Sequence, residues 1–118
     1  MADIESILAQ FENLVRNAEK MIFGEGPFCA KKIEENLRLI KFSASLESIT
    51  GRPGAISLSE KKNYYRETLD EIGEGITPVK EVLTKLKNSG NNRILSLLES
   101  IEKCEKEMSK IGGVIQSF

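Results

Sequence analysis

The feature that most constrains the fold of this sequence is an apolar residue at alternating steps of three and four, repeated along separate segments. The strongest case lies between residues 94 and 118. Every position of the repeat is apolar there: Ile94, Leu97, Ile101, Cys104, Met108, Ile111, Ile115 and Phe118. This spacing places the apolar side chains on one face of an α-helix and is typical of helices that pack in bundles.

Two further segments carry the same repeat. Between residues 3 and 22 its positions are Ile4, Leu8, Phe11, Val15, Ala18 and Ile22. In a third segment they are Tyr65, Leu69, Ile72, Ile76, Val79, Leu83 and Leu86. No long run alternates between apolar and polar residues, so we predict no β-sheet. With a second helix before Thr50, the 118 residues predict a single all-α domain over 1–118, an antiparallel up-down four-helix bundle.

Glycine, proline and asparagine mark the boundaries between these helices, at residues 23–27, 51–54 and 88–92. Glycine commonly follows the last residue of a helix, and these residue types favour turns. The second helix is therefore expected to end near Thr50. Ser57 and Glu60 have the spacing of a capping box, in which each side chain accepts a hydrogen bond from the other residue's backbone N–H, so the third helix is expected to begin there.

The third helix contains a potential break between Gly73 and Pro78. Proline inside a helix costs about 3 kcal/mol and glycine about 1 kcal/mol. Thr77 and Pro78 would also suit the N-cap and first residue of a new helix. The apolar repeat nevertheless continues in phase across the break. We therefore predict one long helix kinked near Pro78, with two shorter helices as the alternative.

The second helix differs from the others because it is apolar on two faces. At about 100° per residue, one side carries a first stripe, which consists of Ile33, Leu37, Ile40 and Ala44. The nearly opposite side carries a second stripe, which consists of Leu39, Phe42, Leu46 and Ile49. Apolar faces are normally covered. Either this helix lies at the centre of the bundle, or its second stripe is an interface with another protein, for which a homodimer is the first choice.

Several kinds of chemistry are excluded or disfavoured by the residue types present. The chain has no histidine, which removes the commonest general base and the usual nitrogen ligand of zinc. Acidic pairs such as Glu67 with Asp70 have a spacing that could serve magnesium, but they project away from the apolar repeat, so solvated charge is expected. Cys29 and Cys104 are expected to be packed, reduced thiols. We therefore expect no enzymatic activity, no metal and no cofactor.

A basic cluster at the start of the third helix offers the alternative function. It consists of Arg52, Lys61, Lys62 and Arg66 beside Tyr64. Cations near a helix N-terminus oppose the helix dipole, so their presence there hints at a use. Such a cluster could bind a phosphate, a nucleotide or single-stranded nucleic acid stacked on the tyrosine. The competing explanation is an ordinary solvated turn.

The charge balance argues against nucleic acid as a general partner, because 17 basic residues stand against 18 acidic ones. The first residues lack the basic and apolar regions of a secretory signal, and no apolar run is long enough to span a membrane. We therefore expect a cytoplasmic protein. The function favoured by the sequence is a non-enzymatic protein–protein interaction module, a small helical subunit, adaptor or chaperone-like protein that binds or self-associates through its second helix.

Overall fold

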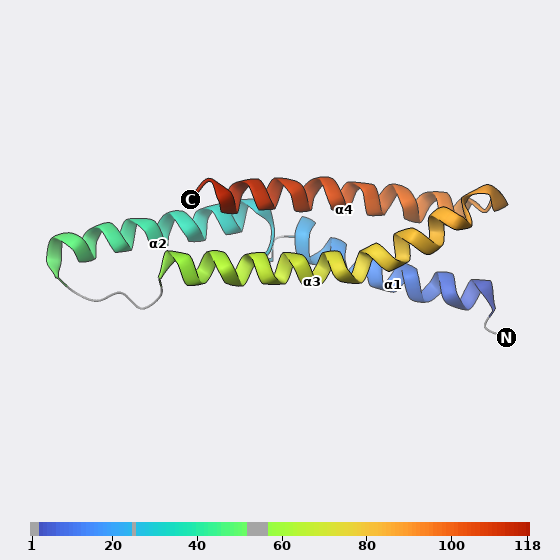
Figure 1. Ribbon diagram of the computed structural model, residues 1–118, viewed down its shortest axis with the longest axis horizontal. Helices are drawn as coiled ribbons and strands as arrows, with labels where there is room; N and C mark the ends of the chain where they lie inside the picture. The colour runs from blue at the N-terminus through green and yellow to red at the C-terminus, as the bar shows by residue number, and fades with distance from the viewer. Residues whose placement is uncertain (1–2, 25, 52–56) are drawn as a thin grey trace.

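The computed structural model describes residues 3–24, 26–51 and 57–118. Across these residues the chain forms helices α1 (Ile4–Phe23), α2 (Ala30–Thr50), α3 (Leu58–Lys85) and α4 (Asn92–Gln116), with a short 3-10 turn, η1 (Lys87–Ser89), before α4 (Figure 1). No strand occurs among them. The predicted all-α four-helix bundle is confirmed.

Side-chain caps fix where three of the helices begin. The backbone N–H of Glu60 donates to Ser57 Oγ at 3.0 Å, which is one half of the predicted capping box. At α4 the N–H of Arg93 donates to Asn91 Oδ1 at 2.9 Å, and α1 is capped by Asp3. Each cap satisfies a backbone donor that has no partner inside the helix. Of these three caps, the one at Ser57 is predicted from the sequence.

The third helix runs unbroken through Pro78, as the phase of its apolar repeat predicts. Figure 1 shows its axis bending in the part that changes from yellow to orange. Because proline has no N–H, the carbonyl of Glu74 lacks its usual donor four residues later, which is a common cause of such bends. Nearby, Thr77 Oγ donates to the carbonyl of Gly73 at 2.8 Å. The helix is therefore kinked rather than divided.

The structure adds one feature that the sequence does not predict: α1 and α2 follow one another along the long axis instead of lying side by side (Figure 1). Glu12 of α1 forms an ion pair with Arg93 at the start of α4. Lys41 of α2 lies over the ring of Phe118 at the end of the chain. Thus α4 packs on α1 with its first half and on α2 with its second half, while α3 runs antiparallel to all three. Three helices therefore pack together along the first half of α4, namely α1, α3 and α4. Along its second half the three are α2, α3 and α4.

The core is built from the apolar repeat. The buried side chains are Leu8, Val15, Ala18, Ile22, Ala30, Ile33, Leu37, Tyr65, Ile76, Val79, Leu83, Ile94, Leu97, Ile101, Cys104, Ile111 and Ile115. The hydroxyl of Tyr65 accepts a hydrogen bond from Asn36 Nδ2 at 2.7 Å, so this polar atom at the edge of the core has a partner. Among the described side chains of α2, burial ends at Leu37.

The molecule is a rod of 64 × 23 × 21 Å. Its radius of gyration is 18.4 Å, whereas a compact domain of this length has about 13.5 Å. It exposes 8035 Å², against about 6,400 Å² for a compact protein of its mass. The rod therefore leaves more surface open than its size requires. No helix among the described residues is long and apolar enough to cross a bilayer.

Candidate interaction surface

The second half of α2 projects beyond the rest of the bundle. The ammonium nitrogen of Lys41 lies 5.9 Å from the ring centroid of Phe118, so α4 ends at this level of α2. The hydrogen bond between Asn36 and Tyr65 sets the register of α3, whose first residue, Leu58, then lies near residue 43 of α2. Figure 1 shows the green end of α2 extending past both neighbours. All side chains from 41 to 46 are exposed.

From Phe42 onward the second stripe lies on this projecting part, and Leu39 lies just before it. Leu39 is 64% exposed, Phe42 62% and Leu46 44%. Ile49 lies within α2, but its side chain is outside the described residues. On the first stripe Ile33 and Leu37 are buried, and the stripe becomes exposed by Ala44, where α4 has ended. The described part of the second stripe is therefore on the surface of this chain and not in its core.

Uncharged small residues flank the second stripe. Ser43 and Ser45 are exposed on either side of it, and Ser45 Oγ donates to the carbonyl of Lys41 at 3.1 Å. Two ion pairs within α2 precede or flank the start of the stripe: Arg38 with Glu34 at 2.7 Å, and Lys32 with Glu35 at 3.8 Å. The stripe is therefore apolar, is bordered near its centre by small side chains, and has two ion pairs at its start.

Two cations of the basic cluster contact neighbouring side chains within α3. Lys61 Nζ lies 4.8 Å from the ring centroid of Tyr64 and 5.2 Å from that of Tyr65, a cation–π arrangement within α3. Arg66 donates to Asn63 Oδ1 at 3.4 Å. Lys62 is partly buried and follows Lys61 on α3, and Arg52 lies outside the described residues. Lys61 thus already has aromatic partners within the chain.

An aromatic cluster that the sequence does not reveal joins the segment just before α2 to α3. Phe28, just before α2, lies 5.9 Å from the Tyr64 ring and 5.8 Å from the Tyr65 ring, centroid to centroid. The two tyrosine rings are 5.8 Å apart. Such tilted and edge-on pairs stabilise beyond the area that they bury. Tyr64, expected as a stacking platform for a ligand, is half exposed and packs against this cluster.

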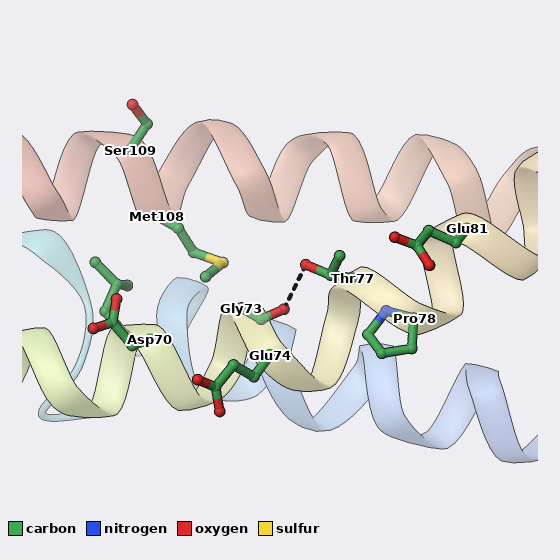
Figure 2. A pocket seen from close by; sticks show the side chains of 9 residues that line it. Asp70, Gly73, Glu74, Thr77, Pro78, Glu81, Met108 and Ser109 are labelled. Carbon is green, nitrogen blue, oxygen red and sulfur yellow. Dashed lines mark hydrogen bonds between the residues drawn. The ribbon is translucent and has the colours of Figure 1, made fainter.

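An open groove lies beside the bend of α3. It measures about 680 Å³ and is lined by Leu69, Asp70, Gly73, Glu74, Thr77, Pro78, Glu81, Met108 and Ser109 (Figure 2). Figure 2 shows the carboxylate of Glu74 pointing away from α4, and Asp70 and Glu74 are exposed. Within the described parts of the chain, no group of three or more cysteine, aspartate or glutamate side chains is arranged to hold a metal ion.

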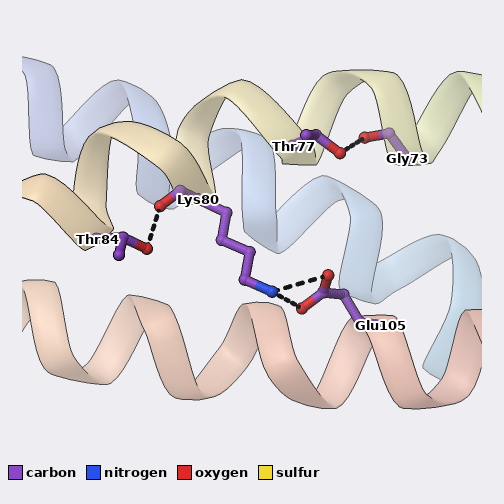
Figure 3. Close-up of polar contacts among 5 residues, drawn as sticks. All are labelled: Gly73, Thr77, Lys80, Thr84 and Glu105. Atoms are coloured by element: carbon purple, nitrogen blue, oxygen red, sulfur yellow. Dashed lines mark hydrogen bonds and ion pairs between the residues drawn. The ribbon is translucent and has the colours of Figure 1, made fainter.

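An ion pair fastens α3 to α4 beyond this bend. Lys80 Nζ donates to both carboxylate oxygens of Glu105, at 2.8 and 3.1 Å (Figure 3). The hydrogen bond and the charge of Glu105 raise the pKa of Lys80. Both side chains are more than two-fifths exposed, so the pair contributes little to stability on its own. It is one polar contact between the second half of α3 and α4, whose packing rests on the buried apolar side chains.

The two thiols lie in different environments. Cys104 is completely buried, and burial, followed by the charges of Glu19 and Glu105, raises its pKa to about 11. Because the thiolate is the nucleophile, this thiol is inert at neutral pH. Cys29 is partly buried just before α2.

Comparison with protein families, with curated proteins and with solved structures finds no match to this chain.

Proposed function

We propose that this chain is a non-enzymatic interaction module that binds a protein through the second stripe of α2. The observation that carries the proposal is the exposure of Leu39 and Phe42, each above 60%, on a helix that projects past the ends of its neighbours. Contiguous exposed apolar patches usually mark interaction sites. An aromatic residue at the centre of such a patch is a typical anchor.

The spacing of the stripe indicates what kind of protein surface it fits. Residues 39, 42 and 46 recur at steps of three and four, so their side chains form one line along the helix. Recognition through a helix uses anchors at this spacing, laid against a groove or another helix. The proposed activity is therefore docking through an exposed helix, with no chemical step.

The test is site-specific photo-crosslinking. A benzophenone amino acid replaces Phe42, and a matched variant carries it in place of Val82, which is 41% exposed on α3. We expect protein adducts, with any polypeptide of the host cell including this chain, from position 42 and not from position 82. Excess wild-type protein should compete, whereas the double variant Phe42→Ser, Leu46→Lys should not. No adduct at position 42, or equal adducts at both positions, overturns the proposal.

A further inference from the structure

The second stripe of α2 is exposed on the face nearly opposite the buried Ile33 and Leu37. Up to Phe118, each level of the rod contains three packed helices. Beyond it α2 continues to Thr50 without α4, and α3 has only just begun. The apolar residues there repeat at steps of three and four, the spacing that one helix offers to another. The occupant that fits is therefore a helix with the same repeat.

We propose that the second stripe of α2 packs against the same stripe of a second copy of this chain, antiparallel, about a two-fold axis at the level of residue 44. This inference rests on the proposed function and names its partner. A self-complementary patch is what a two-fold dimer uses. Because the stripe lies toward one end of a 64 Å rod, the two bodies extend in opposite directions from the contact.

The spacing of the stripe is symmetric about this axis. Antiparallel helices centred on residue 44 place Phe42 opposite the second copy's Leu46, and Leu39 opposite its position 49, which is isoleucine in the sequence. Apolar residues therefore meet apolar residues along the contact. Next to the axis lie Ser43 and Ser45, which are small and uncharged. They let the two helices approach closely, and no like charges meet there.

Electrostatics favours the antiparallel direction over the parallel one. Glu35 lies four residues before Leu39, on the same face of α2. In a parallel pair it would meet its own copy, and opposed like charges destabilise helix pairs. In the antiparallel register Glu35 lies opposite a point beyond Thr50, where the partner's α2 has ended. In the antiparallel pair the two helix dipoles also point in opposite directions, which is the favourable arrangement.

The size of the contact sets the expected strength of the dimer. The two helices overlap from about residue 38 to residue 50, a length of about 20 Å. The surface buried by a contact of this length lies at or below the lower end of the areas buried in stable interfaces, which is about 1,200 Å². Burial of three large apolar side chains from each copy drives association, but the small area limits it. The dimer is therefore reversible and depends on concentration.

Sedimentation equilibrium from low to high micromolar concentrations tests the dimer. The mass should rise from 13.2 kDa toward twice that value. The double variant Phe42→Ser, Leu46→Lys should stay monomeric. The control Leu95→Ser, which alters a leucine that is 38% exposed on α4 near the opposite end of the rod, should dimerise like wild type. A wild-type monomer at every concentration, or identical behaviour of control and double variant, overturns the inference.

The failure of this inference differs from that of the proposed function. If wild type is monomeric and position 42 crosslinks only to other proteins, the second copy is the wrong partner but the docking surface stands. If position 42 crosslinks to nothing, both proposals fail. Adducts of twice the chain mass from position 42, together with the rising mass, support both.

Cysteine crosslinking tests the register with a matched pair of sites. In a Cys29→Ser background, Ser45→Cys and Arg38→Cys occupy the same flank of the stripe, seven residues apart, while the remaining Cys104 is completely buried. In the antiparallel dimer the two copies of site 45 are offset by about 3 Å along the axis and those of site 38 by about 18 Å. A short bis-maleimide should therefore join only the Ser45→Cys protein. Equal crosslinking at both sites, or none at either, overturns the antiparallel register.

Discussion

The ammonium group of Lys41 lies over the ring of Phe118, 5.9 Å from its centroid, and this contact joins the middle of α2 to the last residue of the sequence. On the N-terminal side of this level α2 contributes Ile33 and Leu37 to the core. On the other side its described side chains are exposed. Residues that look equivalent in an apolar repeat therefore differ in burial according to how far the neighbouring helices reach.

The difference in burial predicts a large effect of substitution on the first stripe of α2 and a small effect on the second. Leu37→Ala opens a cavity in the core and should lower the free energy of unfolding by about 2–5 kcal/mol. The double variant Phe42→Ser, Leu46→Lys removes exposed side chains and should change it by roughly 0.5 kcal/mol per site or less. Urea denaturation at low protein concentration measures both. A large loss in the double variant would mean that the second stripe is packed within the monomer.

Two glycines differ in backbone conformation, so replacing each by alanine should change the free energy of unfolding in opposite directions. Gly75 is helical and exposed in α3, and a Cβ atom added there meets nothing within 4 Å. Gly75→Ala should therefore raise the free energy of unfolding by about 1 kcal/mol. Gly90 has a φ of +77° between η1 and α4, so Gly90→Ala should lower it by about 1 kcal/mol. Thermal unfolding of both variants distinguishes the signs, and a destabilised Gly75→Ala would contradict the helical, open environment of Gly75.

The buried thiol of Cys104 predicts both slow labelling and a loss of stability at high pH. Its pKa is raised to about 11 in the folded protein from an ordinary value near 9. The unfolded chain therefore releases this proton at lower pH than the folded one, and the stabilisation, complete below pH 9, is lost as pH rises toward 11. The difference in unfolding free energy between wild type and Cys104→Ala should narrow over this range.

Thiol labelling provides the complementary readout. At neutral pH an aromatic disulfide reagent should modify Cys29 in the folded protein and reach Cys104 only after denaturation, because Cys104 is fully buried and Cys29 is not. A Cys29→Ser variant isolates the second thiol. Fast labelling of Cys104 in that folded variant would show that the core around α4 opens readily.

Much of the fold follows from local patterns in the sequence, because they determine which face of each helix is buried. The Ser57 cap and the unbroken phase across Pro78 are examples in which the local signal agrees with the structure. The repeat does not specify which helix covers each face. The end-to-end placement of α1 and α2 depends on how the chain passes from Gly24 to Ala30. A long-range contact such as Phe28 with Tyr65 likewise has no local signature.

The same limit applies to the candidate site. The two stripes of α2 are evident from sequence, but whether the second is core or surface depends on which face of α2 is covered by α3 and α4 and on where those two helices end. Those ends are set by register between distant segments, which spacing alone does not encode. The exposure of Leu39 and Phe42 is thus known only from the structure, whereas their periodicity can be seen in the sequence.

The contact of Lys61 with two tyrosine rings predicts that the start of α3 is stabilised by this cation. Lys61 Nζ lies within 5.2 Å of both ring centroids, and such contacts contribute about 0.5–2 kcal/mol. Lys61→Met keeps the apolar stem but removes the charge, so it should lower the free energy of unfolding by about that amount. Lys62→Met, one residue away without a ring contact among the described residues, is the control and should change it little. Equal losses in the two variants would instead indicate a general effect of net charge. If a nucleotide or short oligonucleotide raised the melting temperature of wild type and Lys62→Met but not that of Lys61→Met, Lys61 would be available to an anion and the alternative function would gain support.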